Sequence, residues 1–296
     1  MQQVSPGDIL PATFQFVRAH LKAIAIWSAV YLVAVVIMQL GMRPYYEMQL
    51  SGQASSQAML LFLAAYAFLI VVAVVLNAAI FRAALDPQQT DSSYLGFGMD
   101  ELRLLGLLLL ISILFFIATM IATIMAAFVI GFLVAAGGAG AVLGVILGIA
   151  AFIAVMIALI YFAVRLASAG PLTVLRKKIT VREAWRLTRG HFWTLFGTYA
   201  VIAIIWIVVG SVIVMISLNG ELSRAMFEQM RHTGDPIYRQ QMIAAQLRQL
   251  NDFGPLHIIA MAVGAVAYMA MITLWCGSIA IATKLLLDKE EPASVF

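Results

Sequence analysis

The densest group of charged side chains in the sequence is basic, and the chemistry that it offers is the binding of anions. On a helix, Arg182, Arg186 and Arg189 fall at i, i+4 and i+7 and share one face, opposite Trp185. A basic face beside aromatic residues is typical of a helix lying in a membrane interface. We expect this group to anchor the chain to anionic lipid; the alternative is a docking site for an anionic substrate headgroup or a protein partner. Its full membership is Arg176, Lys177, Lys178, Arg182, Arg186 and Arg189.

Carboxylates offer a weaker case for chemistry. Asp100 and Arg103 are three residues apart at the start of an apolar run, which predicts a charge pair at a helix N-terminus. A lipid-modifying enzyme that uses Asp100, Glu101 or His191 is the alternative. Elsewhere the sequence contains no zinc-protease, nucleotide-binding or nucleophile-elbow motif. We therefore expect no enzymatic activity, no catalytic residue and no cofactor.

One group of potential metal ligands lies in the last third of the chain. Glu228 and His232 would share a helix face, and Asp235 follows closely. Two or three ligands without a second histidine are weak support for a metal centre. A structural surface pair is the simpler interpretation, and we expect no metal site.

The composition determines which elements must position these groups. Apolar residues make up 64% of the 296 residues, charged residues make up 11%, and the mean hydropathy is +1.01. A soluble core of this size does not bury so much apolar surface, so we expect an integral membrane protein and no binding of nucleic acid. A spanning helix needs about 20 apolar residues. Six stretches qualify: 22–42, 59–82, 104–134, 140–166, 194–218 and 256–287. They predict an all-α, polytopic bundle that forms a single membrane domain over 1–296.

The distribution of basic residues predicts the orientation. Thirteen of the 18 Lys and Arg residues fall on the side that holds both termini and the 82–103 and 165–193 connections. Loops rich in Lys and Arg face the cytoplasm, so we expect both termini to be cytoplasmic. The first span lacks a small-x-small cleavage pattern, and we expect it to be retained.

The odd-numbered spans share a preceding segment that opens with a hydroxyl residue. Ser5, Ser92 and Thr180 open these segments at spacings of 87 and 88 residues. Ser5 precedes a proline suited to the first helical position, and Thr180 with Glu183 predicts a capping box. The pattern predicts three units, each an elbow helix followed by a helical hairpin.

The middle of every span lacks Asp, Glu, Lys, Arg and His. This argues against transport coupled through a membrane carboxylate. A transporter or flippase for an amphipathic substrate stays open, and its path would be lined by hydroxyl groups such as Thr119, Thr123, Tyr199 and Tyr268. A stripe of small residues at four-residue spacing predicts close helix packing, with a pore-lining helix as the alternative. The stripe consists of Gly140, Gly144 and Gly148.

The 219–254 segment is the only sizeable connection on the opposite side. Leu222, Met226 and Met230 recur at helical spacing, and Gly234-Asp235-Pro236 interrupts the pattern. The segment therefore predicts two short amphipathic helices joined by a turn, on the outer surface of the bundle.

Two stretches resemble a known family. The stretch 183–197, EAWRLTRGHFWTLFG, resembles an elbow motif of the bacterial six-pass family that includes the membrane domain of glycerophosphoryl diester phosphodiesterases. The stretch 94–103, YLGFGMDELR, looks like a recurring segment of proteobacterial membrane proteins. The resemblance implies a multi-pass protein of the bacterial inner membrane. It does not include the phosphodiesterase's catalytic domain, so it implies no activity.

These observations together favour a non-enzymatic accessory or scaffold protein. We expect its partners to be membrane lipids and, at the cytoplasmic basic elbow, a second protein. The transporter or flippase is the alternative function.

Overall fold

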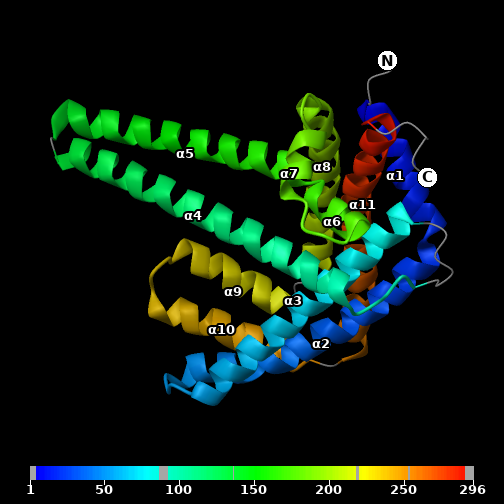
Figure 1. Cartoon of the computed structure of the whole chain (residues 1–296). Helices are drawn as coiled ribbons and strands as arrows, with labels where there is room; N and C mark the ends of the chain where they lie inside the picture. The colour runs from blue at the N-terminus through cyan, green and yellow to red at the C-terminus, as the bar shows by residue number, and fades with distance from the viewer. Residues whose placement is uncertain (1–4, 87–92, 136, 218–219, 253, 291–296) are drawn as a thin grey trace. The chain divides into compact units, whose positions relative to one another are not determined.

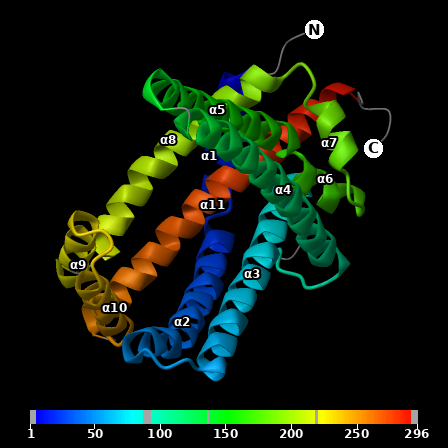
Figure 2. The ribbon, with the colours of Figure 1, turned by 90° about the vertical axis from the view of Figure 1, so that its left-hand side faces the viewer.

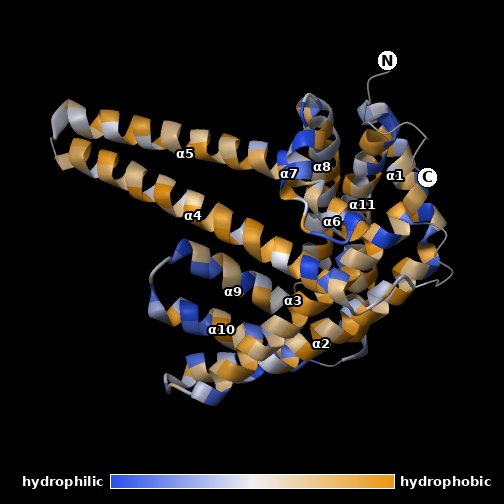
Figure 3. Ribbon diagram, in the orientation of Figure 1, coloured by the Kyte–Doolittle hydropathy of each residue, from blue (hydrophilic) through white to orange (hydrophobic). Residues whose placement is uncertain are grey.

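A computed structural model describes residues 5–86, 93–135, 137–217, 220–252 and 254–290, and within these ranges the chain is helical with no strand. Six of the helices are long and apolar enough to cross a membrane, which confirms the prediction of a multi-pass protein (Figures 1 and 3). Each of the six overlaps one predicted span. They are α2 (Leu21–Ser51), α3 (Ser56–Leu85), α4 (Met99–Ala135), α5 (Gly138–Leu166), α8 (Phe192–Ser217) and α11 (Pro255–Glu290).

The helices form two compact units. One comprises residues 1–9, 97–198 and 279–296, and the other comprises 10–96 and 199–278. The single membrane domain over 1–296 stays a prediction, since it concerns how the two units are joined.

Helices α2 and α3 form an antiparallel hairpin in the second unit (Figure 2). A glycine permits their close approach, because a Cβ at Gly41 would overlap the Cβ of Ala65. The α2 helix continues nine residues beyond its predicted end, through Pro44 to Ser51. The extra turns carry an i,i+4 ion pair in which Arg43 Nε lies 3.0 Å from Glu47 Oε1. Because these turns are polar, the length of the apolar run underestimated the length of the helix.

Helices α4 and α5 form the corresponding hairpin in the first unit, side by side and antiparallel (Figures 1 and 2). Gly144 and Gly148 face α4: an added Cβ at Gly144 would lie 3.2 Å from Leu133, and one at Gly148 would lie 2.7 Å from Ile130. Gly140 lies in the first turn of α5, where its N–H donates to Gly137 O. At 37 residues, α4 is about 55 Å long, compared with about 30 Å for a hydrocarbon core.

Apolar side chains cover the exposed surface of this hairpin. The buried residues of α4 are confined to its first turns, at Glu101, Leu104 and Leu107. Beyond them, large side chains such as Phe116, Phe128 and Phe132 are exposed. Hydrophobic colour runs along both helices of the hairpin in Figure 3. Such a surface is stable when hydrocarbon replaces water as the solvent.

Helices follow two of the three hydroxyl residues that open the predicted segments, and the elbow units themselves stay a prediction. Helix α1 (Pro6–Ala19) follows Ser5, and α7 (Val181–Leu187) follows Thr180. Ser92 lies outside the described residues, and residues 93–98 after it are not helical. Side chains from distant helices hold the backbone carbonyls of this segment: Trp27 Nε1 donates to Ser93 O at 2.8 Å, and Arg82 Nη1 donates to Tyr94 O at 2.6 Å. These acceptors are therefore engaged by side chains rather than by a helix.

The 219–254 segment contains the two predicted helices, α9 (Gly220–Arg231) and α10 (Pro236–Leu250). The α10 helix packs against α9 and α2. The carboxylate of Asp235 caps α10 by accepting the N–H of Ile237 at 2.9 Å, so it is used as a helix cap. His232 Nε2 lies 3.7 Å from Glu228 Oε2. Among the described residues, no group of three or more His, Cys, Asp and Glu side chains could hold a metal ion.

Candidate functional site

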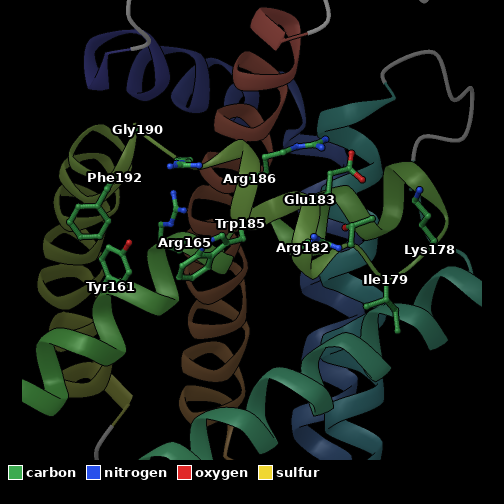
Figure 4. A pocket seen from close by; sticks show the side chains of 12 residues that line it. Tyr161, Arg165, Lys178, Ile179, Arg182, Glu183, Trp185, Arg186, Gly190 and Phe192 are labelled. Carbon is green, nitrogen blue, oxygen red and sulfur yellow. The ribbon is translucent and has the colours of Figure 1, made fainter.

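The first unit contains an open groove of about 1010 Å³. It lies where the end of α5, the loop before α7, α7 itself and the start of α8 meet (Figure 4). We call it the basic groove. Its lining consists of Tyr161, Arg165, Lys178, Ile179, Thr180, Arg182, Glu183, Trp185, Arg186, Arg189, Gly190 and Phe192.

A chain reversal at Lys177, after a short helix that follows α5, creates the groove. A short helix, α6 (Ala169–Arg176), buries Leu172 and Thr173 completely and packs against α4 and α7. It ends at Lys177, which adopts a left-handed φ of 53° that reverses the chain direction. Helix α7 then packs against α5 and α6. The reversal therefore carries the basic residues of α7 over the end of α5.

The predicted capping box at the start of α7 is wrong. Thr180 makes no side-chain cap, and its hydroxyl instead lies 3.3 Å from the hydroxyl of Thr173 on α6. Glu183 Oε1 accepts from Arg176 Nε at 3.1 Å. Both side chains therefore join α6 to α7, because the reversal at Lys177 brings the two short helices together.

Four of the six predicted basic residues line the groove, and all six are exposed at the surface. Arg176 and Lys177 are outside the lining. Arg189 does not extend the helical face of Arg182 and Arg186, because α7 ends at Leu187. A turn places it instead: the buried hydroxyl of Thr188 donates to Arg165 O at 3.0 Å, and Gly190 follows with a φ of 83°.

Arg165 is the site residue that the sequence prediction omitted. Its side chain belongs to the last turn of α5 and rises between Tyr161 and Trp185 (Figure 4). Arg165 is only 5% exposed, and its guanidinium carbon lies 4.5 Å from the centre of the Trp185 ring. Its Nε is buried without a hydrogen-bond partner in the described part of the chain. The only sequence signal is a basic residue at the end of an apolar run, which equally suits a helix-end anchor.

An aromatic cluster forms one wall of the groove. The ring centre of Tyr161 lies 5.1 Å from that of Phe192 and 6.0 Å from that of Trp185. Trp193, next along α8, lies 5.2 Å from Phe192 and is 77% exposed. Aromatic rings of this kind are enriched at the level of lipid headgroups.

The groove carries a strong excess of positive charge. Five cationic residues line it, and of its described lining residues only Glu183 is acidic. The carboxylate of Glu183 already pairs with Arg176 outside the lining. Across the described residues, no ion pair neutralises any of the five lining cations, namely Arg165, Lys178, Arg182, Arg186 and Arg189. The arrangement can therefore attract and hold an anion.

The residues proposed for an enzyme each have a local structural contact. Arg103 Nη1 donates to Asp100 Oδ1 at 2.7 Å, which confirms the predicted charge pair. Glu101 Oε2 accepts the N–H of Gly98 at 2.8 Å, as in the acidic half of a capping box. The ring of His191 lies 3.3 Å from Arg189 O.

The hydroxyl groups proposed for a transport path fall into different units. Thr119 and Thr123 line a mostly apolar cleft of about 320 Å³ between α4 and α5. Tyr268 lies in the other unit, where its ring stacks 4.6 Å from that of Tyr31 beside a cleft of about 200 Å³. Tyr199 is buried, and its hydroxyl has no hydrogen-bond partner among the residues that the structure describes.

The six long helices define a multi-pass α-helical membrane protein. Comparisons of the chain with family models, with curated proteins and with solved structures found no match. The resemblance to the membrane domain of glycerophosphoryl diester phosphodiesterases stays a prediction.

Proposed function

We propose that this protein is a non-enzymatic accessory or scaffold protein that engages anionic lipids, or an acidic partner, through the basic groove. The observation that carries the proposal is the set of five lining cations, which no carboxylate in the described residues neutralises. Each positive charge near an anionic membrane surface contributes about 1 kcal/mol of attraction. The lining cations can attract an anion and hold it in place. No described lining residue is arranged as a nucleophile beside a base.

The membrane placement belongs to the same proposal. We infer that both termini and the groove face the cytoplasm of a bacterial inner membrane, because the connections on that side hold most of the Lys and Arg residues. The elbow helices α1 and α7 support a repeated elbow-and-hairpin plan, as does the resemblance to six-pass bacterial proteins. The aromatic wall, including the exposed Trp193, suits the headgroup region.

Orientation can be measured with single cysteines. In a Cys276→Ala background, Gln53→Cys would report on the α2–α3 turn and Lys178→Cys on the groove, since both positions are exposed. We expect a membrane-impermeant maleimide added to intact spheroplasts to label position 53 and spare position 178. Permeabilised spheroplasts should be labelled at both positions. Labelling of position 178 from outside would overturn the proposed orientation.

The lipid-binding function can be tested by charge removal. The triple variant Arg182→Gln, Arg186→Gln, Arg189→Gln removes three groove charges. The matched control Arg224→Gln, Arg231→Gln, Arg239→Gln removes three charges from α9 and α10. Native mass spectrometry after exchange into mixed phosphatidylglycerol and phosphatidylcholine micelles would count the retained lipids. We expect retention of phosphatidylglycerol to fall in the first variant only, and retention at the wild-type level would refute the proposal.

The cleft between α4 and α5 favours a second candidate function, a transporter or flippase for an amphipathic substrate. Thr119 and Thr123 supply its hydroxyl groups, and it lies within an apolar hairpin. Thr119→Val with Thr123→Val keeps the shape of the cleft and removes both hydroxyls. Scrambling of a fluorescent lipid in proteoliposomes that this double variant abolished would favour transport. Equal scrambling in protein-free vesicles would exclude it.

A further inference from the structure

We infer that the basic groove binds the phosphomonoester headgroup of a lipid, with the phosphate seated against Arg165. This inference rests on the proposed function and narrows it from general attraction for anionic lipids to one class of ligand. It depends on the burial of Arg165, on the direction of its side chain and on the charge of the groove.

Burial of Arg165 requires a compensating anion. An arginine that is 5% exposed has lost most of its hydration, and an unpaired buried charge is expensive. Among the described residues, its guanidinium lies over the ring of Trp185, and its buried Nε donates to no acceptor. A ring face attracts the cation but accepts no N–H hydrogen bond in the guanidinium plane. The donors at the edge of the guanidinium therefore remain for a ligand.

The side chain of Arg165 is directed along the groove that it lines. Figure 4 shows the side chain rising from α5 toward the Gly190 turn, between Tyr161 and Trp185. Arg186 also lines the groove, from α7. The planar fork of an arginine matches two oxygens of one phosphate. Stacking on Trp185 and the hydrogen bond from Thr188 to Arg165 O both restrict the end of α5. The fork is thus held in place before a ligand arrives.

The charge of the groove favours a monoester over a diester. Five lining cations face a single carboxylate that already has a partner. A phosphomonoester carries a charge of about −1.5 to −2 and three free oxygens. A lipid phosphodiester carries a single negative charge and two free oxygens. Arginines line the groove from α5, from α7 and from the turn after α7. They therefore supply hydrogen-bond donors and positive charge for the additional oxygen and charge of a monoester.

The surroundings favour a lipid over a free phosphate. The volume of about 1010 Å³ is far larger than a phosphate ion needs, and the aromatic wall supplies apolar contact on one side. That wall continues onto α8 through Phe192 and Phe196, whose rings stack 5.8 Å apart. A headgroup in the groove would therefore have apolar surface along which its acyl chains could leave.

The test compares two anionic lipids on the full-length protein. Nanodiscs of phosphatidylcholine would contain either phosphatidic acid or phosphatidylglycerol, adjusted to equal surface charge, and bound lipids would be counted by native mass spectrometry. We expect wild type to prefer phosphatidic acid about tenfold, the factor that corresponds to about 1.4 kcal/mol. This comparison needs no variant, so it holds even where Arg165→Gln does not fold. Equal binding of the two lipids would overturn the inference.

Variants assign the preference to Arg165. Arg165→Gln should abolish the preference for phosphatidic acid and retain a general preference for anionic lipid through the other four cations. Arg165→Lys, which keeps the charge and loses the fork, should retain only part of it. Arg224→Gln, an exposed position on α9 outside the groove, should keep the full preference. An unchanged preference in folded Arg165→Gln would overturn the assignment.

Two further outcomes separate the related hypotheses. Loss of all preference for anionic lipid over phosphatidylcholine in wild type would refute the proposed function itself. Inorganic phosphate that displaced phosphatidic acid at millimolar concentration, with equal dependence on Arg165, would identify a free anion as the ligand and overturn the lipid source. We expect inorganic phosphate to leave the bound lipid in place.

Discussion

The guanidinium carbon of Arg165 lies 4.5 Å from the centre of the Trp185 ring, and the two residues are twenty positions apart on α5 and α7. The contact joins the end of a long apolar helix to a short basic one. It also covers one face of a cation that is otherwise shielded from water.

Trp185→Leu should therefore destabilise this junction. A cation–π contact that is largely desolvated contributes about 2 kcal/mol, so we expect a loss of about 1–2 kcal/mol in the free energy of unfolding. Titration with sodium dodecyl sulfate in mixed micelles would measure it. Trp193→Leu is the matched control, because Trp193 is mostly exposed and should change stability little. Equal losses in both variants would contradict a specific role for the contact.

Glu183→Gln should strengthen the binding of anionic lipid. The substitution removes the described acid of the groove lining and increases the net charge of the groove by one. One additional charge near an anionic surface is worth about 1 kcal/mol, so we expect about fivefold tighter retention of phosphatidylglycerol. The pair with Arg176 is partly exposed, and its loss should cost only about 0.2–1 kcal/mol of stability. Glu228→Gln on α9 provides the control, and weaker retention in Glu183→Gln would count against the electrostatic account.

Gly41→Ala should weaken the α2–α3 hairpin. The new Cβ would overlap the Cβ of Ala65, and the carbonyl oxygen of Leu61 lies 3.3 Å away, so the helices must separate. Overpacking of this kind costs about 1–3 kcal/mol. Gly131→Ala on α4 meets nothing within 4 Å and should be neutral or slightly stabilising. The same detergent titration measures both variants. An unchanged free energy of unfolding in Gly41→Ala would show that the two helices separate without cost.

Acid should loosen the start of α1. Asp8 Oδ2 accepts both the N–H and the hydroxyl of Ser5 at 2.8 Å, and the backbone hydrogen bond, followed by the hydroxyl, lowers the pKa of Asp8 below its usual 3.8. Because the folded pKa is depressed, the stabilisation is complete above pH 3.8 and is lost as the pH falls through the lower, folded value. The protection of the first α1 amides, relative to the intrinsic exchange rate at each pH, should fall over that range. In Asp8→Ala, these amides should be weakly protected at every pH. If their protection in the wild type did not depend on pH, the role of the carboxylate would be contradicted.

The sequence was sufficient to predict the six long helices, because continuous apolar runs of this length have one stable conformation in hydrocarbon. It was also sufficient for the two helices of the 219–254 segment, whose turn at Gly234-Asp235-Pro236 carries its own cap. These features depend on neighbours in sequence. The extension of α2 through Pro44 was missed because an ion pair, rather than hydropathy, accompanies it.

Features that depend on distant residues could not be predicted in this way. The segment 93–98 is held by Trp27 and Arg82, which lie far away in the sequence. The reversal at Lys177 reassigns Thr180 and Glu183 from capping to joining α6 with α7. In the sequence, Arg165 cannot be distinguished from any other basic residue at a helix end, because only the fold places Trp185 over it. The basic composition of the groove was therefore predictable, and its buried centre was not.

The groove lies at the junction of three separate stretches of chain, the end of α5, the α7 region and the beginning of α8. A ligand that contacted all of them would hold the three segments together, since its removal would take away contacts to all three at once. Delipidation during purification would then loosen this end of the first unit, whereas restoring a suitable headgroup would tighten it. The composition of the surrounding bilayer would in this way set the rigidity of the protein.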